Sequence, residues 1–159
     1  MILRPAQAGD AEAVAALWNP IIDSTAVTFT TTRKTPEGLA ADFAARGPAF
    51  LLAEEEGRLL GFATFFAFRS GPGYARTLEH TILLAPEAQG RGVGRALMTA
   101  LCAEARAQGA HSMMAGVSGE NPAGIAFHAA CGFREVARLP EVGFKFGRWM
   151  DLVLMQKFL

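Results

Sequence analysis

The apolar positions of this chain repeat at two spacings, and each spacing predicts a different kind of element. Short apolar or alternating runs predict strands, whereas apolar residues three or four positions apart predict helices. Strands are expected at Ile2–Pro5, Phe50–Glu54, Arg58–Phe68, Thr77–Leu84, Met113–Val117, Phe133–Leu139 and Met150–Phe158. Helices are expected after Asp10, from Thr35 to the residues before Gly47, from Val93 to Gln108 and from Asn121 to Ala130.

The ends of these elements carry residues that usually begin or end them. Asp10, Thr35 and Asn121 are expected N-caps, because their side-chain oxygens can accept a hydrogen bond from a free amide of the first turn. Pro36 follows Thr35 at the position where a helix tolerates proline best. The turn Glu55-Glu56-Gly57 separates two predicted strands and indicates a hairpin.

The order of the elements predicts one α/β (α+β) domain over residues 1–159. A length of 159 residues suits a single domain with a sizeable core. One strand, two helices and three strands are followed by helix, strand, helix and two strands. That order describes a mixed sheet with helices on both faces.

Charge and composition exclude several classes of function. The 15 basic and 15 acidic residues balance, so the chain has no excess of positive charge that would favour binding to nucleic acid or an anionic membrane. No apolar run is long enough to span a bilayer, and no secretory signal follows Met1. The cysteines Cys102 and Cys131 lack redox or metal spacing, and the three histidines are scattered, so no metal is expected. A cytoplasmic protein is the simplest expectation.

The run Gln89-Gly90-Arg91-Gly92-Val93-Gly94 is the strongest candidate for a chemical site. It lies between a predicted strand and a predicted helix. Glycines allow the backbone to approach a ligand closely, and the first amides of a helix have no partners and carry partial positive charge. The order strand, glycine turn, helix therefore predicts a phosphate site. The spacing matches neither the dinucleotide fingerprint nor the P-loop, and the competing reading is a glycine turn that only caps a helix.

Read as Gln89-x-x-Gly92-x-Gly94, the run resembles the pyrophosphate loop of the GNAT N-acetyltransferase superfamily. The resemblance implies the GNAT fold, with a mostly antiparallel central sheet, and acetyl-CoA as cofactor. It assigns the pyrophosphate to the loop and adjacent helix start, with Arg91 and Arg95 as possible partners. It assigns thioester polarisation to a backbone amide near Leu83 or Leu84, and a pantetheine contact to Asn121. The residues expected to bind the cofactor are Leu83, Leu84, Gln89, Gly90, Arg91, Gly92, Val93, Gly94, Arg95 and Asn121.

Further segments resemble the phosphinothricin and methionine sulfoximine acetyltransferases, which acetylate the α-amino group of small amino acids. The segments are Asn19 with Ser24–Phe29, Phe68-Arg69 with Gly73-Tyr74, Glu79-His80-Thr81, Glu120-Asn121, His128 with Gly132-Phe133, and Val142–Asp151. The chain departs from that subfamily where Ala75 follows Tyr74, because the arginine comes one residue later at Arg76. Leu83 stands where a tyrosine is common. These departures affect the identity of the substrate more than the reaction type.

Two residues are the candidate acid and base. The resemblance places the general base at Glu79, where partial burial or a relaying water must raise the effectiveness of a carboxylate. His128 is the candidate acid for the departing thiolate, because a histidine pKa suits proton donation near neutrality. The alternatives are a solvent-facing Glu79 and a His128 satisfied by a nearby carbonyl. His80 is expected to be a packed or hydrogen-bonded histidine.

The substrate side is assigned to arginines and aromatic residues. Arg69 or Arg76 is expected to bind an acidic group, since a guanidinium forms two parallel bonds to a carboxylate. Phe29 and Tyr74 are expected to line the pocket, although such aromatics are often core residues. The expected reaction is direct transfer of an acetyl group to a small amino acid by a homodimer. The alternatives are transfer to another amine, such as a protein N-terminus or a polyamine, and a non-catalytic acyl-CoA sensor.

Overall fold

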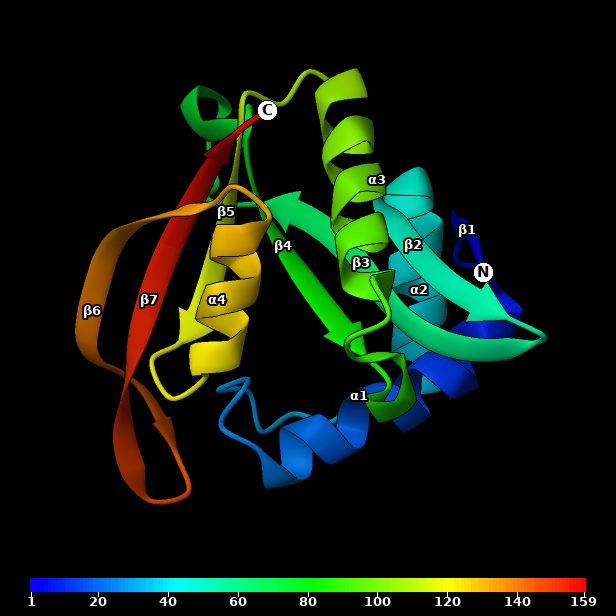
Figure 1. Cartoon of the computed structure of the whole chain (residues 1–159), viewed down its shortest axis with the longest axis horizontal. Helices are drawn as coiled ribbons and strands as arrows, with labels where there is room; N and C mark the ends of the chain where they lie inside the picture. The colour runs from blue at the N-terminus through cyan, green and yellow to red at the C-terminus, as the bar shows by residue number, and fades with distance from the viewer.

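The computed structural model describes all 159 residues and contains one seven-stranded sheet (Figure 1). The strand order is β1-β2-β3-β4-β5-β7-β6, and every neighbouring pair is antiparallel except β4 and β5, which are parallel. The strands are β1 (Ile2–Pro5), β2 (Phe50–Glu55), β3 (Arg58–Ala67), β4 (Thr77–Leu84), β5 (Ser112–Ser118), β6 (Arg134–Lys145) and β7 (Arg148–Phe158). The mixed sheet and its element order are the α/β architecture that the sequence predicts.

Four α-helices cover the two faces of the sheet. They are α1 (Ala11–Ser24), α2 (Pro36–Arg46), α3 (Val93–Ala107) and α4 (Pro122–Ala130). Helices α1 and α2 pack on one face and α3 and α4 on the other, as the two separate hydrophobic clusters require (Figure 1). None of the helices combines the length and the apolar character that a membrane crossing demands.

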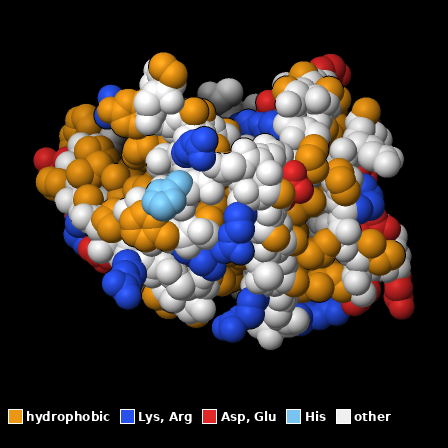
Figure 2. All heavy atoms as spheres, turned by 90° about the horizontal axis from the view of Figure 1, so that it is seen from above, with side chains coloured by type: hydrophobic (Ala, Val, Ile, Leu, Met, Phe, Trp, Pro, Cys, Tyr) orange, Lys and Arg blue, Asp and Glu red, His pale blue; other side chains and the backbone are white.

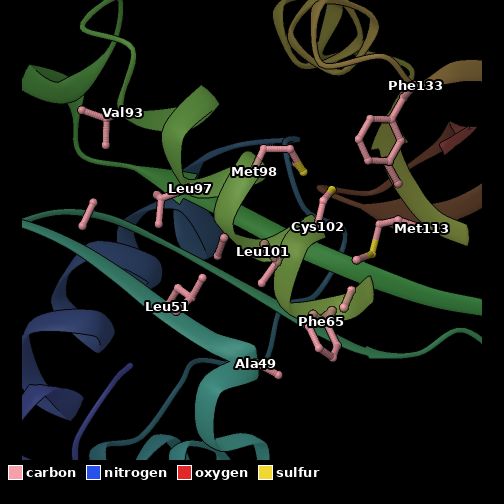
Figure 3. Close-up of a cluster of buried hydrophobic side chains, with 14 of the residues drawn as sticks. Ala49, Leu51, Phe65, Val93, Leu97, Met98, Leu101, Cys102, Met113 and Phe133 are labelled. Atoms are coloured by element: carbon pink, nitrogen blue, oxygen red, sulfur yellow. The ribbon is translucent and has the colours of Figure 1, made fainter. Parts of the chain in front are cut away.

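The larger hydrophobic cluster lies between α3 and the sheet. Leu97, Leu101 and Ala105 are fully buried one or two turns apart on α3, so a single stripe of this helix faces the strands. In Figure 3, Leu97 and Leu101 point from α3 toward Leu51 of β2, and Met113 of β5 and Phe133 lie on the side of Cys102. The core therefore fixes α3, and with it the glycine turn that precedes the helix.

Two of the three predicted N-caps are confirmed. The Thr35 hydroxyl accepts a hydrogen bond from Gly38 N at 3.1 Å, and Asn121 Oδ1 accepts one from Gly124 N at 2.9 Å. The prediction for Asp10 is wrong, because its side chain caps no amide of α1. Its carboxylate instead accepts hydrogen bonds from Gln7 N and from both terminal nitrogens of Arg4. An adjacent guanidinium is a stronger partner than an amide, and it determines where the carboxylate points.

The last hairpin is longer than predicted. β6 begins one residue after Phe133 and continues to Lys145, well beyond Leu139. The pairing with β7 slips between Leu139 and Gly143, and this irregularity breaks the alternation that would have signalled one long strand. Phe133 is outside the strand and is buried against the cluster beneath α3.

Candidate functional site

Strands β4 and β5 lie side by side only over their first residues. Their parallel pairing ends at Glu79 and Met114. β4 continues to Leu84 and β5 to Ser118, and the two strands diverge toward the end of the sheet where α3 begins (Figure 1). One edge of β4 is therefore left without a strand partner inside the protein.

Two cavities lie along this divergence. The larger has a volume of about 540 Å³ and extends from the loop after α1, past β4, to the glycine turn and α4. The smaller, of about 150 Å³, reaches between β4 and β5. The cavities meet, because they share the lining residues Val27, Ile82, Leu83, Asn121 and His128.

The backbone amides of β4 divide between the two sides of the strand. In an antiparallel pair, successive residues turn their N–H and C=O groups alternately toward and away from the partner. Thr77 O accepts from Phe68 N and Ala85 N donates to Leu60 O, so the odd-numbered residues of β4 face β3. Leu84 and Ile82 therefore direct their amides into the divergence. Leu83 directs its amide toward β3, and it contributes to the site as a lining residue of both cavities.

The glycine turn presents a row of free amides at the start of α3. Gly90 and Gly92 have φ values of 73° and 80°, a conformation in which other residues are strained. No amide from Gly92 to Arg95 donates to another group of the protein, and the same is true of Gly90. The buried Val93 and the buried face of α3 hold this row in place. The arrangement fits an anionic phosphate group.

The structure separates the two arginines that were expected beside the phosphates. Arg95 lines a cavity of about 200 Å³ together with Gly90, Gly92 and Gly94. Arg91 lies outside that cavity, and its guanidinium donates to Glu55 at 2.6 Å. Gln89 lines the large cavity beside Gly90. The loop thus places Arg95, and not Arg91, on the cavity wall.

Glu79 lies where the pairing of β4 with β5 ends. Its carboxylate oxygen is 3.0 Å from the point where a Cβ of Gly116 would lie, so the missing side chain on β5 makes room for it. The carboxylate accepts no hydrogen bond from the protein, and burial raises the pKa of Glu79. Glu79 lines neither cavity itself, but Gly116 lines the smaller one, so the carboxylate lies beside that cavity.

His128 lies where the two cavities meet. Its Nδ1 is 2.7 Å from the carbonyl oxygen of Gly124, and its Nε2 is 3.2 Å from Nε2 of His80. Burial lowers the pKa of His128, and the bond to Gly124 opposes that shift. His80 is buried beneath Phe133, as a packed histidine was expected to be.

Asn121 has two functional groups with different surroundings. Its oxygen caps α4, and its Nδ2 has no partner in the protein. Because Asn121 lines both cavities, that amide is available to a ligand. The cap and a ligand contact are therefore compatible in one side chain.

The expected substrate residues do not line either cavity. Arg69 and Tyr74 pack together in the exposed β3–β4 loop, with the guanidinium 5.2 Å from the ring centre, and Arg76 is exposed beside them. Figure 2 views this end of the molecule and shows basic side chains spread across the middle of the face. Phe29 lies with its ring on Gly143, where a Cβ would come within 2.5 Å of it.

The loop after α1 supplies lining residues that were expected only as part of the segment Ser24–Phe29, without a role of their own. Val27 and Thr28 line the smaller cavity, and Lys145 holds this loop by donating to Thr25 O at 2.7 Å and Thr28 O at 2.8 Å. Lys145 is only 2% exposed, and burial lowers its pKa. Ile82 and Phe127 also line the large cavity. The sequence did not indicate this, because apolar side chains at regular spacing are typical of core residues.

Comparisons with known proteins agree with this geometry. Residues 18–133 match the acetyltransferase (GNAT) family. The chain is 38% identical to the L-methionine sulfoximine/L-methionine sulfone acetyltransferase of Salmonella typhimurium, covering 98% of this chain and 93% of the relative. An acetyltransferase structure from Salmonella typhimurium with its cofactor acetyl-CoA superposes with a TM-score of 0.94 at 38% identity, covering 100% of this chain and 94% of the other. A phosphinothricin acetyltransferase from Sinorhizobium meliloti in complex with acetyl-CoA gives 0.91 at 33% identity, covering 99% and 88%.

The diverging strands, the free amides of the glycine turn and these matches define an acetyl-CoA-dependent N-acetyltransferase. The chain belongs to the GNAT acetyltransferase family, and its similarity extends to the phosphinothricin and methionine sulfoximine acetyltransferases.

Proposed function

We propose that this enzyme acetylates the α-amino group of a small amino acid such as methionine sulfoximine, methionine sulfone or phosphinothricin. The observation that carries the proposal is the junction of the two cavities at His128 and Asn121, of which the smaller also passes Gly116 beside the Glu79 carboxylate. One cavity leads to the glycine turn and the other leads between the strands. A donor and an acceptor can therefore meet at one point. The relatives' substrates supply the amino-acid class.

Four groups of residues would hold acetyl-CoA. The free amides of Gly90, Gly92 and the α3 start suit its pyrophosphate, with Arg95 beside them. The unpaired edge of β4 offers the amides of Ile82 and Leu84, and Asn121 offers its Nδ2. Bound there, the cofactor supplies an activated acetyl thioester, so no enzyme nucleophile is required. Transfer to the amine is direct.

Glu79 acts as the general base in this proposal. The amine must be neutral to attack, and a carboxylate with a raised pKa accepts a proton better than an ordinary one. The carboxylate lies at the closed end of the divergence, where it takes the proton directly or through one water. His128 acts as the acid that protonates the departing thiolate, because it lies on the walls of both cavities.

The test is release of free CoA thiol from acetyl-CoA across a panel of amines. The panel contains methionine sulfoximine, methionine sulfone, phosphinothricin, the common amino acids, polyamines and a peptide N-terminus. Turnover that is strongest with the first three supports the proposal. Turnover only with the peptide or a polyamine would move the activity to that amine, and cofactor binding without any turnover would favour a sensor.

The enzyme forms a homodimer through the β6–β7 hairpin in this proposal. Phe144, Phe146 and Trp149 are 54–60% exposed on this hairpin, and β6 is an edge strand of the sheet. Large exposed aromatics on a sheet edge are unusual in a monomer. Sedimentation should give a dimer for the native chain and a monomer for Trp149→Arg. Phe158→Arg, at an equally exposed aromatic on β7, is the control that should remain dimeric.

A further inference from the structure

The loop after α1, residues 25–35, has almost no means of holding itself in place. None of its side chains is buried, and from residue 26 to residue 34 its backbone makes no hydrogen bond with other backbone groups. At its far end, Asn19 of α1 bonds both backbone groups of Lys34, at 2.8 Å and 3.0 Å. Side chains of other elements therefore determine where this loop lies.

Lys145 holds the near end of the loop from the β6–β7 hairpin. Its Nζ donates to Thr25 O at 2.7 Å and Thr28 O at 2.8 Å, and lies 5.0 Å from the centre of the Phe146 ring. Successive side chains of a strand point to opposite faces, and on β6 Phe144 is 55% exposed whereas Lys145 is 2% exposed. Hydrophobicity alone favours the reverse arrangement.

No ion pair explains why this ammonium is buried. None of the ion pairs of the protein involves Lys145. Asp23 is near enough to influence the pKa of Lys145, but its carboxylate pairs with Arg33. A lysine is rarely buried unless it is paired, because the charge loses its hydration. The two loop carbonyls are therefore the groups that this buried lysine serves.

A second contact joins the hairpin to the same loop, and the loop in turn forms cavity wall. A Cβ on Gly143 would come within 2.5 Å of the Phe29 ring, so the ring closes on a glycine of β6. Val27 and Thr28 line the smaller cavity, and Thr25 and Val27 line the larger one. Both carbonyls that Lys145 bonds thus belong to residues of the wall.

We propose that Lys145 is a positioning residue for the amino-acid substrate, because it fixes the loop that walls the smaller cavity. The inference rests on the proposed function, in which this cavity receives the amino acid. Acetyl-CoA is held mainly elsewhere in that proposal, at the glycine turn and along β4. Loss of Lys145 should therefore weaken the use of the amino acid more than that of the cofactor.

The first test separates the two KM values. Lys145→Met removes the donor and keeps an unbranched chain. The KM for the amino acid should rise about 10-fold, because a small displacement of groups that position a substrate has a large effect. The KM for acetyl-CoA should stay within about 2-fold of the native value, as is usual for changes away from a site. Lys145→Arg returns a charged donor and should recover most of the loss.

Lys157→Met is the matched control. Lys157 also donates from its Nζ to a backbone carbonyl, that of Cys131 at 2.8 Å, but it lies on β7 and makes no bond to the loop. This variant should leave the KM for the amino acid unchanged. An equal rise in the two lysine variants would contradict a specific role for Lys145.

Trypsin cleavage reads the loop without turnover. Arg33 is exposed in the loop, and Arg69 and Arg76 are exposed in the β3–β4 loop, where they serve as internal references. Cleavage after Arg33 should be about 10-fold faster in Lys145→Met, because two hydrogen bonds are lost and proteolysis follows the population of the open loop. Cleavage after Arg69 and Arg76 should not change. If all sites are cleaved faster, the variant is unfolded, and Lys145→Gln, with a polar side chain of shorter reach, takes its place.

The outcomes separate this inference from the proposed function. Unchanged cleavage after Arg33, or faster cleavage with an unchanged KM for the amino acid, would overturn the role of Lys145 in an active enzyme. A native enzyme that acetylates a different amine overturns only the proposed substrate class, and the KM for that amine then tests Lys145 in the same way. A native chain that acetylates no amine overturns the proposed function, and this inference with it.

Discussion

The cofactor cleft and the β3–β4 loop were both expected to hold functional residues, but only the residues of the cleft line cavities. The glycine turn, Asn121 and Leu84 meet around connected cavities. Arg69, Tyr74 and Arg76 lie in an exposed loop at the other end of β4 and line no cavity. The cleft is built from backbone amides whose direction follows from strand pairing and helix start. Any site in the loop would depend on long side chains, and packing in the core does not determine where these side chains point.

Glu79→Gln should give the largest effect, because it removes the proposed base and keeps the shape of the side chain. We expect kcat to fall about 100-fold while acetyl-CoA still binds. In the native enzyme kcat should fall as the pH drops through the pKa of Glu79, since the base works only when ionised, and burial puts that loss at a higher pH than for an ordinary glutamate. Undiminished turnover by the variant would show that Glu79 is not the general base.

Gly92→Ala should give the next largest effect, by straining the glycine turn. Gly92 has a φ of 80°, which costs an alanine about 1 kcal/mol, and the strain falls on the amides that we propose bind the pyrophosphate. The KM for acetyl-CoA should rise about 5-fold, in line with that free energy. Gly9→Ala is a matched control, since Gly9 has open space around it and no positive φ. Equal kinetics in the two variants would argue against a role for this turn.

Arg95→Ala and Arg91→Ala should differ in their KM for acetyl-CoA, and the difference shows which arginine contacts the cofactor. Arg95 lines the cavity at the turn, whereas Arg91 is engaged with Glu55. We expect Arg95→Ala to raise the KM for acetyl-CoA roughly 3-fold to 5-fold, as the loss of one exposed charge contact would. Arg91→Ala should change that KM less. The reverse order would mean that the phosphate draws Arg91 away from Glu55.

Replacing Arg69 and Arg76 together by alanine should give the smallest effect. Neither residue lines a cavity, so kcat and the KM for acetyl-CoA should stay within about 2-fold of the native values, as is usual for exposed side chains far from a site. The decisive quantity is the KM for the amino acid. A rise of about 10-fold or more would correspond to a lost carboxylate contact and would bring the loop into the substrate site.

Much of the fold could be predicted from sequence because its signals are local. Thr35 and Asn121 cap their helices as expected, and the stripe on α3 is buried as its spacing indicates. Asp10 failed as a cap because Arg4, six residues earlier, competes for its carboxylate. The slip in pairing within β6 also has no local signature.

The candidate site was most predictable from the residues alone where one continuous segment builds it. The glycine turn is continuous in sequence, so its free amides could be foreseen. The contact of His80 with His128 joins residues 48 positions apart, and Lys145 reaches Thr25 across 120. Such pairs depend on how the sheet and helices pack, and they cannot be predicted from the residue types alone. Val27 and Thr28 entered the cavity wall by the same long-range contact.

The unpaired edge of β4 also links ligand binding to the stability of the folded protein. A ligand that hydrogen-bonds to this edge does what a missing neighbouring strand would do, and it does so only in the folded protein. Its binding free energy then adds to the free energy of unfolding, by about 2.7 kcal/mol at a concentration 100 times its dissociation constant. The melting temperature should therefore rise with the acetyl-CoA concentration. An enzyme in a cell that is short of acetyl-CoA would be not only idle but also easier to unfold.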